Sequence, residues 1–193
     1  MGTRDSTRNR LLDAVDELVF AGGDTQAPVD RILERAGASP ATLYRAYGSK
    51  EALVAAALDR RHQEWLAAWD AAVARADTDR GRLLAVFDAL AEFQARPDGA
   101  RWCAFLGTAA GYADPPPVLA AAVRQDTESL RSRLRELAEP VVGASAADRL
   151  TDALALVYSG QLAMRLRSGT APGVGVAREL ADLLLEEAER SGG

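Results

Sequence analysis

The chain has 193 residues, of which 48% are hydrophobic and 6% aromatic, and its formal net charge is −5. It contains no run of about 18 apolar residues, which a membrane span would need, and its polar first ten residues do not resemble a secretory signal. The single cysteine, Cys103, cannot form an internal disulfide, so we expect a cytoplasmic protein.

The acidic charge is unevenly distributed along the chain. Residues 1–61 carry nine basic and nine acidic side chains, whereas residues 62–193 carry fourteen basic and nineteen acidic ones. The excess negative charge therefore lies outside the first sixty residues. This balance permits a local DNA-binding surface near the N-terminus but does not demand one.

Helix signals dominate the sequence. Apolar residues recur at helical spacing over 11–19, and Gly22 with Gly23 ends that pattern. A long helix is expected over 50–76, with Ser49 as its cap. Later helices are expected at about 79–95, 100–112, 116–138, 145–168 and 173–190, separated mainly by prolines. No segment alternates like a strand, so the sequence predicts an all-α fold of about nine helices.

Two short helices are expected between the first helix and the long one, at 28–36 and 40–46. Pro28 suits a first helical position, Gly37 allows a tight turn, and Ser39 can cap the second short helix. This arrangement predicts a helix-turn-helix, in which the second short helix enters the major groove of DNA.

The second short helix carries the predicted DNA contacts. Its small N-terminal side chains allow close approach, and Thr42 can bond a base or touch a thymine methyl group. Tyr44, Tyr47 and Lys50 are expected to contact phosphates. The full predicted set is Arg4, Ser39, Pro40, Thr42, Tyr44, Arg45, Tyr47 and Lys50. The alternative, an ordinary helical hairpin within a core, would bury several charged and tyrosine side chains together.

The pattern AGxSxxTLYxxYxSKExL, which begins at Ala36, resembles the DNA-binding module of the TetR family of repressors. The resemblance covers about residues 8–58. It implies a DNA-binding domain at 1–48 and a helical ligand-binding and dimerisation domain at 49–193. The chain departs from the family pattern at Pro28, near where Ser or Thr is usual, and at Asp30, where other members present basic or polar contacts. Whether these changes weaken DNA binding stays open.

The resemblance also implies a homodimer, formed by the last two helices of each chain. A C2 dimer would place two recognition helices about 34 Å apart on a roughly palindromic operator. The residues expected at this interface are Leu150, Leu154, Val157, Gln161, Val176, Leu180, Leu183 and Leu184.

A pocket for a small hydrophobic ligand is the third implication. The candidate residues are His62, Trp65, Trp69, Phe87, Leu90, Trp102, Phe105, Tyr112 and Tyr158. His62 could equally be a packing residue, and Cys103 is expected to be an inert buried thiol.

The sequence bears on two alternative functions. The first is an enzyme, which we do not expect, because the only His and the only Cys lie far apart in the sequence. The sequence also has no metal-ligand spacing and no phosphate-binding loop, so we expect neither a metal nor another cofactor. The second is a TetR-like ligand-binding protein with weak or lost sequence-specific DNA binding. The favoured reading is a repressor whose partners are an operator, a second copy of the chain and a small hydrophobic ligand. Activation in place of repression stays open.

Overall fold

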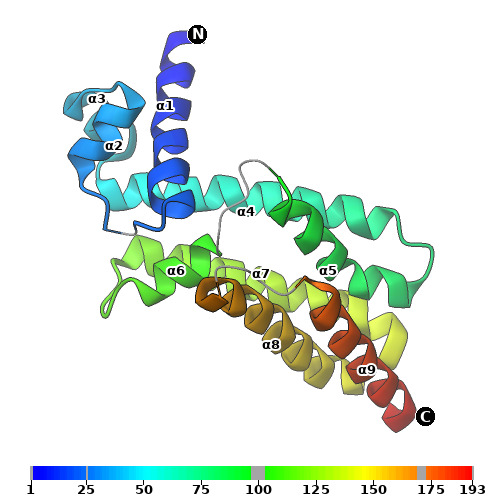
Figure 1. Cartoon of the computed structure of the whole chain (residues 1–193). Coiled ribbons are helices and arrows are strands. Elements are labelled where there is room, and N and C mark those ends of the chain that lie inside the picture. The colour runs from blue at the N-terminus through cyan, green and yellow to red at the C-terminus, as the bar shows by residue number, and fades with distance from the viewer. Residues whose placement is uncertain (1, 25, 97–102, 169–172, 193) are drawn as a thin grey trace. The chain divides into compact units, whose positions relative to one another are not determined.

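A computed structural model describes residues 2–24, 26–96, 103–168 and 173–192. The described residues form nine α-helices, one π-helical turn and no strand, which confirms the predicted all-α fold (Figure 1). In chain order the elements are α1 Gly2–Val15, η1 Asp16–Ala21, α2 Val29–Ala36, α3 Pro40–Tyr47, α4 Lys50–Ala74, α5 Asp79–Gln94, α6 Ala104–Ala110, α7 Pro117–Val142, α8 Ala144–Ser168 and α9 Gly175–Gly192. None of the helices in these ranges is long and apolar enough to cross a membrane.

The helix ends follow the cap residues closely. Ser39 accepts a hydrogen bond from the Thr42 N–H at the start of α3, as predicted. Pro28 is in extended conformation and precedes α2, so its predicted place inside the helix is corrected to the cap position. Pro140 lies inside α7, which continues to Val142, so the expected end near 138 is wrong. A proline this near the C-terminal end disturbs only the last turn of the helix.

The first helix changes its winding before it ends. After Val15 the backbone becomes the π-helical turn η1, and the Gly22 N–H closes this turn by donating to the Glu17 carbonyl at 2.8 Å. A Cβ atom at Gly22 would lie 2.6 Å from the Leu18 carbonyl oxygen, so only glycine fits this position. The predicted stop at Gly22 is therefore confirmed, although the π geometry was not expected.

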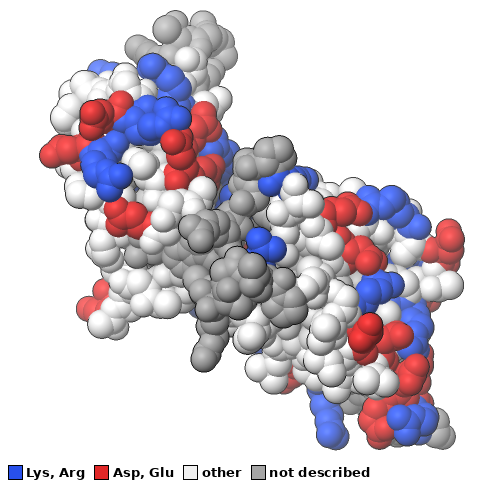
Figure 2. Space-filling view, in the orientation of Figure 1, with Lys and Arg blue, Asp and Glu red and all other residues white. Residues whose placement is uncertain are grey.

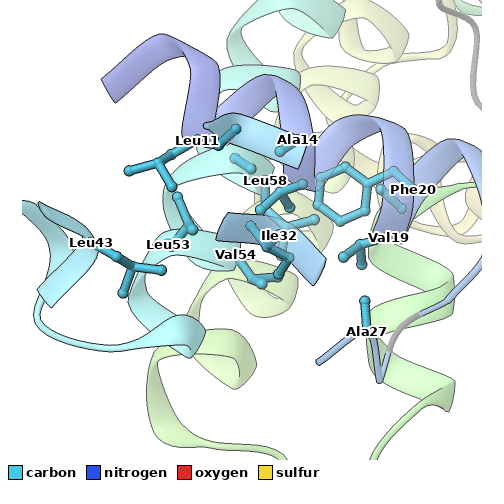
Figure 3. Close-up of a cluster of buried hydrophobic side chains, with 14 of the residues drawn as sticks. Leu11, Ala14, Val19, Phe20, Ala27, Ile32, Leu43, Leu53, Val54 and Leu58 are labelled. Carbon is cyan, nitrogen blue, oxygen red and sulfur yellow. The ribbon is translucent and has the colours of Figure 1, made fainter. Parts of the chain in front are cut away.

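The described chain divides into two compact units. Unit 1 comprises Met1–Gln63 and Ala100–Gln125, and unit 2 comprises Glu64–Gly99 and Asp126–Gly193. The module predicted for residues 1–48 lies wholly within unit 1. Its core belongs to a continuous apolar cluster contributed by η1, α1 to α4, α6 and α7, in which Leu43 and Leu53 are fully buried (Figure 3). Burial of this cluster holds the short helices α2 and α3 in place, since helices of eight residues are not stable alone.

Unit 2 is organised around the last two helices. Helices α8 and α9 lie side by side, and α9 also packs against α5 (Figure 1). Arg80 of α5 reaches Asp182 at 2.7 Å and Glu189 at 2.8 Å on α9. Arg178 of α9 pairs with Asp88 of α5 at 2.6 Å. These partly exposed pairs fix the register of α5 against α9 more than they add stability.

Candidate nucleic-acid interface

The turn between α2 and α3 has the geometry of a helix-turn-helix. Gly37 ends α2 in the left-handed region, at φ 58° and ψ 43°. The Ala38 N–H then donates to the Leu33 carbonyl at 3.0 Å, which satisfies one of the last acceptors of α2. A glycine is needed at this turn because other residues rarely adopt a positive φ.

Helix α3 is held by one buried side chain and exposes the opposite face. Leu43 is fully buried, and Figure 3 shows it in the same apolar cluster as Leu53 of α4. On the other side Pro40, Ala41 and Arg45 are exposed, and Tyr44 keeps 53% of its surface accessible. The helix therefore presents small side chains at its N-terminal end and larger ones further along.

Ser39 and Thr42 are linked at the N-terminus of α3. The Thr42 N–H donates to Ser39 Oγ at 3.3 Å, and the two hydroxyl oxygens are 2.9 Å apart. Because a hydroxyl both donates and accepts, each oxygen keeps a capacity for one more hydrogen bond. The pair is therefore pre-positioned to bond a polar group in front of the helix.

Tyr47 has a different surrounding from Tyr44. It is half-buried, and its hydroxyl donates to the Arg8 carbonyl in α1 at 3.4 Å. The Arg8 guanidinium lies 5.7 Å from the Tyr47 ring centroid and also donates to the Ala46 carbonyl at 3.1 Å. Burial raises the pKa of Tyr47, and the nearby Arg8 and Arg60 charges lower it by less. These contacts fit a residue that positions α3 better than one that contacts phosphate.

Cations near α3 differ in whether they already have a partner. Arg31 and Arg35 of α2 pair with Asp24 and Glu17, at 3.3 and 2.5 Å. Arg45 and Lys50, by contrast, form no ion pair within the part of the chain that the structure describes. Lys50 is the first residue of α4, and Ser49 caps that helix by accepting from the Ala52 N–H at 3.0 Å. Unpaired cations beside a helix N-terminus are suited to bind phosphate.

Other charges around this surface are mixed in sign. Asp30, in the first turn of α2, is exposed, and no partner for it is found among the described residues. On the face shown in Figure 2, basic and acidic side chains alternate over the region of α1 to α3. The Arg4 side chain lies outside the described residues. Sequence reasoning missed Arg8, because its partner Ala46 is 38 residues away and no local pattern marks the pair.

The predicted ligand residues fall in both units. In unit 1, His62 is only 4% exposed and makes an edge contact with Phe105, at 6.0 Å between centroids. Tyr112 is half-buried, and burial together with the Glu51 charge raises its pKa. Trp102 lies outside the described residues.

In unit 2 the candidates form a compact aromatic group. The Trp65 ring centroid lies 5.8 Å from Trp69, 5.8 Å from Tyr158 and 5.6 Å from Phe93. Phe93 was not predicted, although it lies on α5 three residues after Leu90. Leu90 and Phe87 are themselves buried in α5. The structure thus brings together three of the predicted residues, Trp65, Trp69 and Tyr158, and adds a fourth ring.

The residues expected at the dimer interface also separate into two groups. Leu150, Leu154 and Gln161 are buried within the chain, while Val157 and Leu184 are half-buried. The apolar residues that face solvent are Leu156 and Met164 on α8 and Val176, Leu180 and Leu183 on α9. A groove of about 370 Å³ between the two helices is lined in part by Leu150 and Leu184. The solvent-facing side of α8 is therefore rotated from the one expected from the sequence.

No group of three or more His, Cys, Asp or Glu residues able to hold a metal ion is found in the ranges that the structure describes. Cys103, expected to be buried, is half-buried.

Comparison with known proteins gives a consistent result. Residues 11–57 match the family model for bacterial regulatory proteins of the tetR family. A TetR-family transcriptional regulator from Streptomyces coelicolor is 26% identical, with a TM-score of 0.80 over 97% of this chain and 96% of that one. A Streptomyces avermitilis protein assigned as a TetR transcriptional regulator is 28% identical, with a TM-score of 0.75 over 95% and 98%. No curated sequence matches the chain.

More distant structures share the fold alone. A TetR transcriptional regulator from Chloroflexus aurantiacus has a TM-score of 0.79 at 23% identity, over 95% of this chain and 96% of that one. The family model covers the helix-turn-helix, and the two Streptomyces structures extend the likeness over nearly the whole length. Residues 11–57 therefore carry the DNA-binding module of the tetR family of bacterial regulatory proteins, and the chain as a whole is similar in fold to TetR-family transcriptional regulators.

Proposed function

We propose that this chain is a homodimeric transcriptional repressor that binds a roughly palindromic operator and releases it when a small hydrophobic ligand binds. The observation that carries the proposal is the exposed face of α3. Leu43 fixes the helix from behind, while Pro40, Ala41 and Arg45 remain open to a partner. This is the arrangement that a recognition helix needs in order to enter the major groove.

Base and phosphate contacts divide along this surface. Ser39 and Thr42 stand at the N-terminal end of α3, where side chains of a recognition helix reach base edges. Arg45 and Lys50 have no internal ion pair among the described residues and are free to neutralise phosphates. Tyr44 is exposed and is proposed to contact a phosphate. Tyr47 is proposed to position α3 instead, because its hydroxyl already donates to the Arg8 carbonyl.

The dimer interface is proposed on α8 and α9. Val176, Leu180 and Leu183 recur at spacings of four and three, so they form one stripe along α9. Leu156 is 74% exposed on α8. Large apolar side chains exposed in a row are typical of a protein interface, and two such helices from each chain would form a four-helix bundle. The interface residues proposed on α8 are accordingly Leu156 and Met164.

Ligand response would pass through α4. This helix begins at Lys50, beside the proposed phosphate contacts, and later carries Trp65 and Trp69. A ligand that favours one of two positions of α4 would change the spacing of the two recognition helices. A coupling free energy of about 1–3 kcal/mol would change operator affinity by about 5–150-fold.

A ligand-binding protein with weak DNA recognition is the second candidate. Two observations favour it. Asp30 is exposed at the start of α2, where it would repel phosphate, and the first 61 residues have equal numbers of basic and acidic side chains. Both features would lower the electrostatic part of DNA affinity.

The experiment that decides between the two is selection of DNA sites from a random library with the full-length protein, at low salt. The repressor proposal expects one palindromic sequence. For that site Thr42→Ala should weaken binding by about 1–3 kcal/mol, because it removes a base contact. Thr127→Ala, an exposed threonine on α7 outside the module, is the matched control and should bind normally. Enrichment of no sequence would reject the repressor and leave the ligand-binding alternative.

A further inference from the structure

The aromatic group of unit 2 is centred on one side chain. Trp65 contacts Trp69 of the same helix, Phe93 of α5 and Tyr158 of α8, and we call these four residues the Trp65 cluster. Phe93 meets Trp65 edge-on at 80°, whereas Trp69 and Tyr158 are tilted by 36° and 40°. Aromatic rings from three helices thus converge on one place, which suits a planar molecule that stacks against them.

Three polar atoms on the helices of this cluster are buried without a partner. Trp69 Nε1, Gln94 Nε2 and Thr151 Oγ1 form no hydrogen bond with any residue that the structure describes. Trp69 is fully buried and Thr151 is 3% exposed. A buried donor that makes no bond loses its hydration without compensation, and such groups are rare in folded proteins. Nε1 is the only polar atom of the Trp69 side chain, so no other hydrogen bond of that side chain offsets the cost of burying it.

Ion pairs join the residues that follow Trp69 and Thr151 to α7. The Arg133 guanidinium of α7 lies 4.8 Å from the Trp69 ring centroid and pairs with Asp70, the next residue of α4. Two residues earlier on α7, Arg131 pairs at 2.5 Å with Asp152 of α8, which follows Thr151. The Trp69 ring therefore lies beside α7, and the residue that follows Thr151 is paired with the same helix.

The third atom belongs to an amide whose orientation is set. Gln94 Oε1 accepts from Arg165 Nη1 at 2.5 Å, so its NH2 group is the part left without a partner. Gln94 directly follows Phe93 of the Trp65 cluster. Arg165 forms no ion pair in the ranges that the structure describes, which leaves a positive charge near the amide.

We propose that the Trp65 cluster binds a planar aromatic compound that carries an oxygen acceptor, and that this oxygen accepts a hydrogen bond from Trp69 Nε1. The inference rests on the ligand response in the proposed function and narrows its ligand class. Trp69 Nε1 can only donate, and the unpaired atom of Gln94 is also a donor. An apolar molecule would leave Trp69 Nε1 unpaired, whereas a ketone or carboxylate oxygen would accept its hydrogen bond. A carboxylate would in addition gain from the charge on Arg165.

The test uses three naphthalenes that differ at one substituent: 2-acetylnaphthalene, 2-naphthoate and 2-ethylnaphthalene. Binding to the full-length protein is measured by calorimetry without DNA. The two compounds with an oxygen acceptor should bind at least about tenfold more tightly than the ethyl compound, as expected when a buried donor is otherwise left unpaired. Either order of ketone and carboxylate supports the proposal, and a tighter carboxylate would assign a part to Arg165. Equal affinities for all three, or no binding of any, would overturn it.

Two tryptophan variants locate the acceptor. Trp69→Phe keeps an aromatic ring but removes the donor, so it should abolish the preference for the acceptor-bearing compounds. Trp65→Phe makes the same chemical change at a ring whose nitrogen is not among the buried atoms that lack a partner, so it should weaken all three compounds alike. A preference that survives in Trp69→Phe would overturn the role of Trp69 Nε1.

The melting temperature tests whether the buried Thr151 hydroxyl is unpaired or is hydrogen-bonded to water in the unliganded protein. Thr151→Val removes a buried hydroxyl and retains its shape, so it should raise Tm of the unliganded protein if the hydroxyl is unpaired. A fall in Tm would show that solvent satisfies the group and would count against the proposal. Operator binding is measured separately, so loss of DNA binding bears on the proposed function and loss of ligand selectivity bears on this inference.

Discussion

The Arg8 guanidinium donates a hydrogen bond to the Ala46 carbonyl at 3.1 Å and thereby joins α1 to the last turn of α3. The same guanidinium lies over the Tyr47 ring, and the Tyr47 hydroxyl bonds back to the Arg8 carbonyl at 3.4 Å. A cation at the C-terminal end of a helix is also favourable for the helix dipole. Arg8 therefore holds the end of the recognition helix that Leu43 does not reach.

Arg8→Ala is expected to weaken operator binding through the position of α3. Loss of the charge-assisted bond to Ala46 should raise the Kd for the selected site by about 5–30-fold, or about 1–2 kcal/mol. Binding to random DNA should change less, because it depends mainly on phosphate neutralisation. Fluorescence anisotropy with both DNAs measures the two effects.

Arg10→Ala is the matched control for Arg8. This substitution removes the same charge from the same helix. The hydrogen bond that it breaks, however, joins Arg10 to Thr7 within α1, at 3.2 Å. If Arg8→Ala weakens specific and random DNA equally, Arg8 is a phosphate contact and has no positioning role.

Lys50→Ala is expected to weaken binding to all DNA by a similar factor. Lys50 has no internal ion pair among the described residues and stands at the N-terminus of α4, so we expect it to neutralise one phosphate in each half of the operator. The slope of log K against log salt should then fall by about one for each half-site that it contacts. Lys50→Arg keeps the charge and should keep the slope. A slope that is unchanged in Lys50→Ala would remove Lys50 from the phosphate contacts.

The sequence predicted local structure well because caps and breakers act over a few residues. Ser39, Gly37 and Gly22 each stand at the helix boundary expected for them, and the all-α fold follows from such signals. Contacts between residues far apart in the sequence could not be predicted from it. Nothing near Arg8 in the sequence indicates Ala46, and nothing near Trp65 indicates Phe93.

The dimer face shows where helical periodicity is insufficient. On α8 the pattern of Leu150 and Leu154 marks an apolar face, but periodicity cannot say whether that face meets another part of the same chain or a second chain. In the structure both side chains are buried within the chain, and Leu156 is the exposed leucine. On α9 the expected Val176, Leu180 and Leu183 are indeed exposed, since Ala177, Ala181 and Leu185 fill the inner face.

Leu183→Glu is expected to disrupt the proposed dimer. Leu183 is 60% exposed in the chain, so a charge there should leave the folded chain nearly intact. Burying that charge against a second copy would cost several kcal/mol, so the dimer should dissociate in sedimentation at micromolar concentration. Val118→Glu, at a valine on α7 that is 41% exposed, is the control and should leave the mass unchanged. A dimer that persists in Leu183→Glu would place the interface elsewhere.

Asp16 in η1 joins α4 to the first helix through Arg60. Arg60 Nη2 bonds Asp16 Oδ2, and its Nη1 bonds Asp13 Oδ1 at 2.8 Å. Asp16 Oδ1 is buried and lacks a partner among the described residues. Burial therefore raises the pKa of Asp16 above its usual value, and the hydrogen bond and charge of Arg60 only partly oppose this shift.

A raised pKa has a definite consequence for stability. Between the unfolded value, about 3.9, and the higher folded value, the folded chain binds more protons than the unfolded one. The stabilisation from this group is therefore complete below the unfolded pKa and is lost as pH rises through the folded pKa. Asp16→Asn cannot titrate, so the free energy of unfolding of the wild type relative to this variant should fall as pH rises from about 4 to about 7. Urea unfolding of both proteins across this range measures the difference. A difference that grows with pH would mean that pairing with Arg60 outweighs burial, and that the pKa of Asp16 is lowered in the folded protein.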